Sequence, residues 1–240
     1  MLTLFLVDAE LELVPELLLG HRAVSAPAKQ RGKRTSRTLL DASKHHHAMR
    51  EKNLPEADRR GRPDITHVTL LTALDAALNL EGGLKVRVHT RNDELLTIRP
   101  ETRIMRNQER FQGLIEKLFE EGQVGPRDKP PLMTLEPKTP LKTALAWEQP
   151  DHVIALSPEG EPTAPFDAFP RVADAHDHVA ILLGGFPRGD YKSPVAELAD
   201  ETWALAERPL SAWVAAAEVL VAWRHTTRGM AKHRAAPPQT

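Results

Sequence analysis

A glycine-rich segment, Leu183–Gly189, has the residue types that bind a flat ligand through the backbone. Its three glycines let amides and carbonyls approach a ligand more closely than residues with side chains allow. The spacing matches neither the G-x-G-x-x-G dinucleotide fingerprint nor the phosphate-binding P-loop, and tight turns are the alternative interpretation. About twenty residues later, Leu205–Leu210 leads from a strand into a helix. Two such loops side by side could hold an adenine between backbone polar groups and leucine side chains.

The tripeptide Arg62–Asp64 combines an arginine and a carboxylate across a rigid proline. Proline fixes the backbone, so Asp64 could hold the Arg62 guanidinium in one direction. The alternative is that Asp64 caps a helix beside an ordinary surface arginine. In the first case the pair would suit recognition of a phosphate or a base.

Three further arginines, Arg103, Arg106 and Arg110, are spaced three and four residues apart. If the helix that follows begins early enough, they form one basic stripe that suits phosphates or a splayed base. A solvated helix face is the alternative. The sequence therefore offers two arginine clusters and one glycine-lined site.

Two clusters of histidines and aspartates contain residue types that can bind a metal, but their spacing argues against a metal site. His45–His47 follows Asp41, and Asp177 lies within His176–His178. Adjacent histidines point in different directions on a helix or a strand, and the H-E-x-x-H spacing is missing. We expect no metal. With no cysteine in the chain, disulfides and thiolate chemistry are excluded, and no Gly-x-Ser-x-Gly motif supports a serine hydrolase.

The elements that position these residues follow from apolar periodicity and turn residues. We expect strands over Thr3–Leu13, Leu84–Thr90, Glu94–Arg99, His152–Leu156, His178–Leu183 and Thr202–Ala206. Helices are expected over Arg37–Lys52, from Asp64 or Thr66 to Asn79, around Phe111–Phe119 and over Leu210–Arg224, with a proline-rich link at 122–140. Consecutive strand and loop units predict an α/β sheet whose loops gather at the carboxyl ends of the strands. Residues 1–240 are expected to form a single domain with a flexible tail at 225–240.

The composition is that of an ordinary folded protein, with 41% hydrophobic and 27% charged residues. No apolar run approaches the roughly 18 residues that span a bilayer, so we expect no membrane contact. The net charge of −1 hides a basic segment at 20–37 that contains no acidic residue. We expect this segment to be a loop that either meets phosphate or is simply solvated and mobile.

The order of these blocks resembles the SPOUT methyltransferases. Gly184–Gly189 and Leu205–Leu210 are similar to the carboxyl-terminal half of that class, in which the chain threads a trefoil knot around S-adenosylmethionine. Arg62–His67, Leu70–Asp75 and Arg103–Phe111 resemble the family that methylates pseudouridine at ring nitrogen 1 in small-subunit rRNA. The resemblance covers about 39–223. It implies an α/β, SPOUT-type trefoil-knotted fold with a parallel sheet and family-specific β-hairpin and helix insertions.

The resemblance also implies site residues and partners. The cofactor S-adenosyl-L-methionine would be bound by Leu156, Ser157, Gly184, Gly185, Gly189, Leu205, Ala206, Glu207, Arg208, Pro209 and Leu210. The rRNA would be bound by Arg62, Asp64, Arg103, Arg106 and Arg110, and no catalytic base is assigned. The expected target is a hairpin-loop pseudouridine, and the expected protein is a cytoplasmic homodimer acting in ribosome biogenesis. A non-catalytic ribosome-assembly factor and a SPOUT tRNA methyltransferase are the alternatives.

Overall fold

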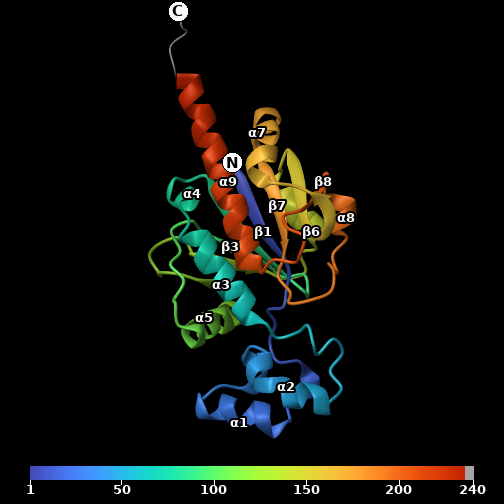
Figure 1. The fold of residues 1–240 in the computed structure, drawn as a ribbon. Helices are drawn as coiled ribbons and strands as arrows, with labels where there is room; N and C mark the ends of the chain where they lie inside the picture. Colours follow the sequence, from blue (N-terminus) through green and yellow to red (C-terminus); the bar gives the residue numbers. More distant parts are fainter. Residues whose placement is uncertain (236–240) are drawn as a thin grey trace, which may run out of the picture.

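The protein is built on one mixed sheet, seen in a computed structural model that describes residues 1–235 (Figure 1). The strands are β1 (Leu2–Ala9), β2 (Leu84–Thr90), β3 (Leu95–Ile98), β4 (Gln123–Val124), β5 (Met133–Glu136), β6 (His152–Pro162), β7 (Val179–Gly184) and β8 (Glu201–Ala204). Their spatial order is β4-β5-β3-β2-β1-β7-β6-β8. Within this order, the neighbours in the run β2-β1-β7-β6-β8 pair parallel. The neighbours in the run β4-β5-β3-β2 pair antiparallel. The expected parallel sheet with a hairpin insertion is confirmed.

Helices cover both faces of this sheet. They are α3 (Pro63–Leu74), α4 (Ala77–Leu80), α5 (Gln108–Glu121), α6 (Leu141–Glu148), α7 (Pro165–Ala175), α8 (Val195–Leu198) and α9 (Ala212–Ala235). Figure 1 shows α3, α9 and α7 across one face. The strand β1 is buried on both sides because its side chains alternate between two apolar clusters. Leu4 joins the cluster that includes α3, α5 and α9, whereas Phe5 joins the one beneath α6 and α8.

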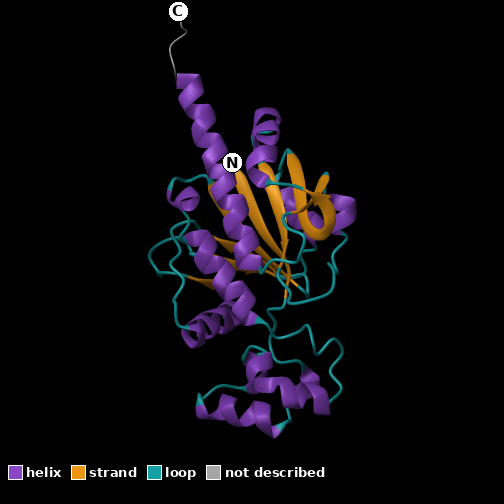
Figure 2. Cartoon of the chain, viewed as in Figure 1, coloured by secondary structure: helices purple, strands orange, loops and turns teal. Residues whose placement is uncertain are grey.

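A small helical lobe, residues 14–60, extends from one end of the sheet (Figure 2). It contains the 3-10 turns η1 (Glu16–Leu18) and η2 (Thr35–Arg37) and the helices α1 (Arg22–Gln30) and α2 (Ala42–Glu51). A separate apolar cluster holds it together, including Leu18, Leu40 and Met49. We interpret the chain as one domain with the lobe as an insertion.

Four local expectations differ from the structure. The segment 20–37 is not a loop, because α1 and η2 occupy most of it. The link 122–140 contains β4 and β5. The first strand ends at Ala9 instead of Leu13, where Asp8 adopts a positive φ of 51°. The expected flexible tail is helical as far as Ala235 in α9, and 236–240 lie outside the described residues.

Candidate cofactor pocket and arginine surface

The glycine loop, residues 184–194, follows β7 and packs too tightly to accept side chains at its start. A Cβ on Gly184 would lie 2.8 Å from the Phe186 ring, and one on Gly185 would lie 2.7 Å from the Cα of Ala9. Gly189 has a φ of +78°, which residues with side chains rarely adopt. Three glycines are therefore required by packing or by backbone conformation at this loop.

A pocket of about 650 Å³ opens where β6, β7 and β8 end. This volume lies in the range of small-molecule sites, and its place at the carboxyl ends of parallel strands is where α/β proteins bind ligands. All of the predicted cofactor residues except Gly185 and Glu207 line it. Leu183 and Phe186 of the glycine-rich segment also line it, whereas sequence reasoning missed Tyr191, Trp203 and Ala215. Their aromatic and small apolar side chains resemble ordinary core residues, so no local signal separated them.

Side-chain hydrogen bonds tie the glycine loop to the neighbouring strands. The buried Asp8 carboxylate accepts hydrogen bonds from the backbone amides of Lys192 and Ser193 at 2.7 and 3.0 Å, and from the Ser193 hydroxyl at 2.7 Å. The Tyr191 hydroxyl lies 2.8 Å from the carbonyl oxygen of Leu156 and 3.1 Å from that of Leu182. Burial raises the pKa of Tyr191, so its hydroxyl stays a donor. These hydrogen bonds anchor the pocket wall to β1, β6 and β7.

Arg62 and Asp64 form the pair that the sequence predicted. The Arg62 guanidinium donates to both carboxylate oxygens of Asp64, from Nε at 2.8 Å and from Nη2 at 2.7 Å. Pro63 occupies the first position of α3, which it favours because its fixed φ suits the helix start. Donating these hydrogen bonds to Asp64 raises the pKa of Arg62. Both side chains are about one-third exposed, so the guanidinium is oriented yet accessible.

The other arginines do not form the predicted stripe on one helix. Asn107 caps α5 by accepting from the Arg110 amide at 3.0 Å, so Arg103 and Arg106 precede the helix. All three arginines are exposed. Arg106 lies 3.8 Å from the Asp75 carboxylate. The arginines therefore reach solvent from a loop and a first helical turn.

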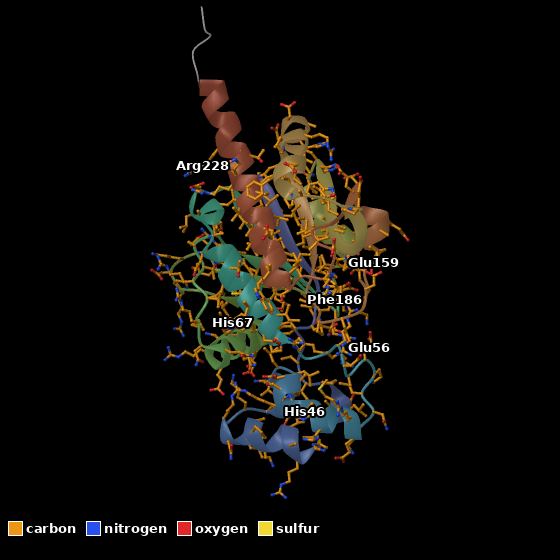
Figure 3. The ribbon with its side chains drawn as sticks, viewed as in Figure 1. His46, Glu56, His67, Glu159, Phe186 and Arg228 are labelled. Carbon is orange, nitrogen blue, oxygen red and sulfur yellow. The ribbon has the colours of Figure 1, made fainter. Side chains whose placement is uncertain are left out.

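A buried histidine fixes this arginine loop. His67 lies on α3 (Figure 3). It donates from Nε2 to the carbonyl oxygen of Met105 at 2.7 Å, and its ring stacks on Phe111 with centroids 4.5 Å apart. A carbonyl can only accept, so Nε2 carries the proton. His67 was visible in the sequence as part of the Arg62–His67 block, but its partner lies 38 residues away.

Three basic side chains of the segment 20–37 form ion pairs with carboxylates of α5. Arg31 donates to both oxygens of Glu116 at 3.1 and 2.6 Å, and Lys33 reaches the same carboxylate at 2.5 Å. Glu116 is almost fully buried, and its Oε1 also accepts from the Leu39 amide at 3.2 Å. Arg37 pairs with Glu120. These three cations dock the lobe on α5.

The histidine clusters serve structure. His45 is buried, its Nδ1 accepts from the Asp41 amide at 3.1 Å, and burial lowers its pKa. The His178 ring nitrogen lies 2.8 Å from the Thr3 hydroxyl. Within residues 1–235, histidine and acidic side chains form no group of three that could hold a metal ion. The helices of the same residues also include none with the length and apolarity to span a bilayer.

Comparison with solved structures identifies the class. The chain superposes on Archaeoglobus fulgidus Nep1 bound to S-adenosylhomocysteine with a TM-score of 0.82 and 33% identity, covering 94% of this chain and 98% of that one. The sheet order and the pocket after β6, β7 and β8 are thus those of an α/β methyltransferase of the SPOUT class.

Sequence comparison identifies the family. The model of the EMG1/NEP1 methyltransferases matches residues 4–224, and the chain belongs to this family. The ribosomal RNA small subunit methyltransferase Nep1 of Methanothrix thermoacetophila is 44% identical over 221 residues, covering 92% of this chain and 94% of its own length. The protein of the same name from Thermococcus kodakarensis is 43% identical over 221 residues, covering 92% and 96%.

Proposed function

We propose that this protein is an S-adenosylmethionine-dependent methyltransferase of small-subunit rRNA that acts in ribosome biogenesis. The observation that carries the proposal is the pocket after β6, β7 and β8, which coincides with the predicted cofactor residues. The solved relative binds S-adenosylhomocysteine, the product that remains when S-adenosylmethionine loses its methyl group. The relatives' shared name, ribosomal RNA small subunit methyltransferase, supports the substrate.

The residues present fit the cofactor. Leucines at Leu156, Leu183 and Leu205 give the pocket apolar walls suited to an adenine, and glycine backbone lies beside them. Carboxylates of Glu159 and Asp190 also line it and suit a ribose hydroxyl or a positively charged ligand. When bound, S-adenosylmethionine supplies an electrophilic methyl group. The chain's contribution is to hold this cofactor and the target base in line, because positioning supplies much of the rate in such a transfer.

The finer proposal is that the target is ring nitrogen 1 of a hairpin-loop pseudouridine. Its support is the resemblance of Arg62–His67 and Arg103–Phe111 to the family specific for that atom, together with the exposure of the arginines. Unstacked loop bases are what RNA-binding proteins usually read. Both oxygens of Asp64 already accept from Arg62, which favours a supporting role over that of a proton acceptor. We assign no general base.

A homodimer with a trefoil-knotted chain in each subunit, acting in the cytoplasm, completes the proposal. Membership of the SPOUT class supports both the knot and the dimer. Support for the dimer comes from α9 and the segment that leads into it, where Leu210, Val214 and Val221 expose large apolar side chains. A second copy would remove this apolar surface from water. Sedimentation equilibrium should give twice the chain mass, and Val221→Asp should shift it toward the monomer.

The target assignment is tested with two hairpin RNAs that differ only in uridine or pseudouridine at one loop position. We expect methyl transfer from labelled S-adenosylmethionine to the pseudouridine hairpin alone. Equal methylation of both hairpins would remove the pseudouridine assignment. Bound cofactor without methylation would favour the non-catalytic assembly factor, and preference for a tRNA would favour the tRNA methyltransferase.

The arginine surface is tested by changing Arg103, Arg106 and Arg110 singly to Ala. Each change should weaken hairpin binding by about three- to tenfold and lower the salt dependence by about one phosphate contact. Binding of S-adenosylhomocysteine should stay within about twofold, since these residues lie outside the pocket lining. Loss of cofactor binding would show that the arginine surface has been placed wrongly.

A further inference from the structure

We propose that Arg59 is a positioning residue that holds the glycine loop from the helical lobe and thereby links the arginine surface to the cofactor pocket. The inference rests on the proposed function for the identity of the two ligands, and on the contacts of Arg59 for the link itself. Arg59 belongs to none of the sequence blocks that predicted the site, and it does not line the pocket.

Arg59 spans the junction between the lobe and the loop. Its side chain is only 8% exposed. Nε donates to Glu10 at 2.5 Å, and Nη1 donates to the carbonyl oxygen of Asp190 in the glycine loop at 2.5 Å. The guanidinium carbon lies 4.0 Å from the centroid of the Phe186 ring. One rigid, planar group thus contacts a carboxylate after β1, a loop carbonyl and a pocket-lining aromatic ring.

Glu10 is the residue through which these contacts converge. Its carboxylate is fully buried and accepts hydrogen bonds from both Arg59 and Arg91. The Nη1 atom of Arg91 lies 2.6 Å from this carboxylate. Its backbone amide donates to the carbonyl oxygen of Gly185 at 3.1 Å, and its own carbonyl accepts from the Arg62 amide at 2.9 Å. A single residue therefore bonds to the glycine loop on one side and to the backbone of Arg62 on the other.

The chain between Arg59 and Arg62 is short and constrained. Gly61 has a φ of +69°, and a Cβ there would lie 2.9 Å from the Leu40 side chain. Its carbonyl oxygen accepts from the Ala42 amide at 2.8 Å at the start of α2. A displacement of Arg62 by a bound RNA would therefore be passed to Arg59 instead of being absorbed by a flexible linker.

Two further ion pairs run between the lobe and the glycine loop. Glu56 accepts from Lys192 at 3.0 Å, and Asp58 lies 3.4 Å from Arg188. Both pairs are largely exposed and contribute little on their own. The buried Arg59 contact differs because its removal would leave the Glu10 charge with one partner fewer in a dry site.

A purely structural arginine would only need to neutralise Glu10. Arg59 instead also donates to the Asp190 carbonyl, and its Nη2 is buried without a hydrogen-bond partner among the described residues. An unpaired buried donor is costly, and it leaves the guanidinium able to take a further acceptor when the loop adjusts to a ligand. This arrangement fits a group that responds to the loop.

The test compares Arg59→Met with Arg60→Met. Arg60 is the neighbouring arginine, pairs with Glu12 through two contacts at 2.8 and 2.6 Å and has no hydrogen bond to the glycine loop. In the ligand-free protein, hydrogen exchange at the Lys192 and Ser193 amides should accelerate by about tenfold or more in Arg59→Met and by less than about twofold in Arg60→Met. Equal acceleration in the two variants would overturn the positioning role.

Calorimetry with S-adenosylhomocysteine, with and without the pseudouridine hairpin, tests the link. Arg59→Met should raise the cofactor Kd by about tenfold, and Arg60→Met should leave it within about twofold. In the wild type the hairpin should change the cofactor Kd, and Arg59→Met should bring the ratio of the two Kd values close to one. A wild-type ratio of one would overturn the link, as would a ratio unchanged by Arg59→Met.

A conservative variant covers the case in which Arg59→Met does not fold. Arg59→Lys keeps a positive charge near Glu10 but lacks the planar fork that reaches Glu10 and Asp190 together. It should fold, with faster loop exchange and weaker cofactor binding than the wild type. Wild-type values for both would contradict the proposal. If the wild type itself binds no S-adenosylhomocysteine, the proposed function fails, and the exchange comparison still decides the role of Arg59.

Discussion

The cofactor pocket and the helical lobe are held in place by opposite kinds of interaction. The pocket is built from leucines, glycines and backbone groups at the ends of strands that sit in the main apolar core. The lobe has a small apolar cluster and is docked on the sheet and on α5 mainly by charges, with buried carboxylates at Glu10, Glu12 and Glu116. A segment rich in arginine and lysine can therefore be a docking element, and composition alone does not distinguish it from an RNA-binding one.

From this difference we expect cofactor binding to be weakened most by a substitution that adds a side chain where the glycine loop is tightly packed. In Gly185→Ala the new Cβ would lie 2.7 Å from the Cα of Ala9, so the glycine loop must move away from β1. Overpacking of this kind costs about 1–3 kcal/mol. We expect S-adenosylhomocysteine to bind about 5- to 150-fold more weakly by calorimetry, which is that energy converted to affinity.

Gly113→Ala is the matched control. A Cβ at Gly113 meets nothing within 4 Å, and the residue lies in α5, where alanine favours the helix. Its cofactor affinity should equal that of the wild type. Equal loss in both variants would mean that the tight approach of Gly185 to Ala9 is not what shapes the pocket.

The lobe, in contrast, should be destabilised most by removing a buried charge that docks it on α5. Glu116→Gln leaves Arg31 and Lys33 facing a neutral amide in a partly buried site. Because both cations are more than one-third exposed, water screens part of the loss, and we expect about 2 kcal/mol of destabilisation. Urea unfolding measures this change, and hydrogen exchange should show α1 opening first.

Glu120→Gln provides the exposed counterpart, since both Arg37 and Glu120 are about half exposed. It should cost less than about 0.5 kcal/mol. If the two variants were equally stable, the lobe would be docked by its apolar contacts and the contrast with the pocket would disappear.

Apart from the Glu120→Gln control, the smallest expected effect concerns pH at the junction of the two regions. Hydrogen bonds from Lys192 and then Arg91 lower the pKa of Glu56 from its ordinary 4.5 to about 2. A lowered pKa stabilises the fold above pH 4.5, and this contribution is lost as the pH falls from about 4.5 toward 2. Glu56 is 44% exposed, so the effect should stay below about 1 kcal/mol. Glu56→Gln should lose less stability than the wild type between pH 6 and pH 3.5 in urea titrations; an identical loss would contradict this.

The pocket was more predictable from the sequence than the lobe. The apolar runs that form β6 and β7 and the glycines that follow β7 are local signals, and the loops they lead into do line one pocket. The resemblance then supplied the ligand, which no periodicity could give. In the lobe, the helix expected over Arg37–Lys52 is the shorter α2, and α1 was missed because Pro27 lies inside it and suggested a loop.

Other errors have equally specific causes. The strands β4 and β5 are two and four residues long and flank a proline-rich stretch, so no alternation marked them. The helix α7 was not predicted because it begins at Pro165 and contains Pro170, and prolines usually indicate a break in a helix. The arginine stripe failed because the Asn107 cap starts α5 after Arg106. Arg59 was missed because its importance depends on Glu10 and Asp190, which are distant in sequence.

The pairing of Arg62 with Asp64 has an entropic consequence. A free arginine side chain loses roughly 2 kcal/mol of rotational freedom when it is immobilised by a ligand. In this protein the fork to Asp64, the proline that follows and the start of α3 have already restricted that freedom during folding. Whatever acceptor meets Arg62 therefore has less disorder to remove, and more of the contact energy is left for affinity.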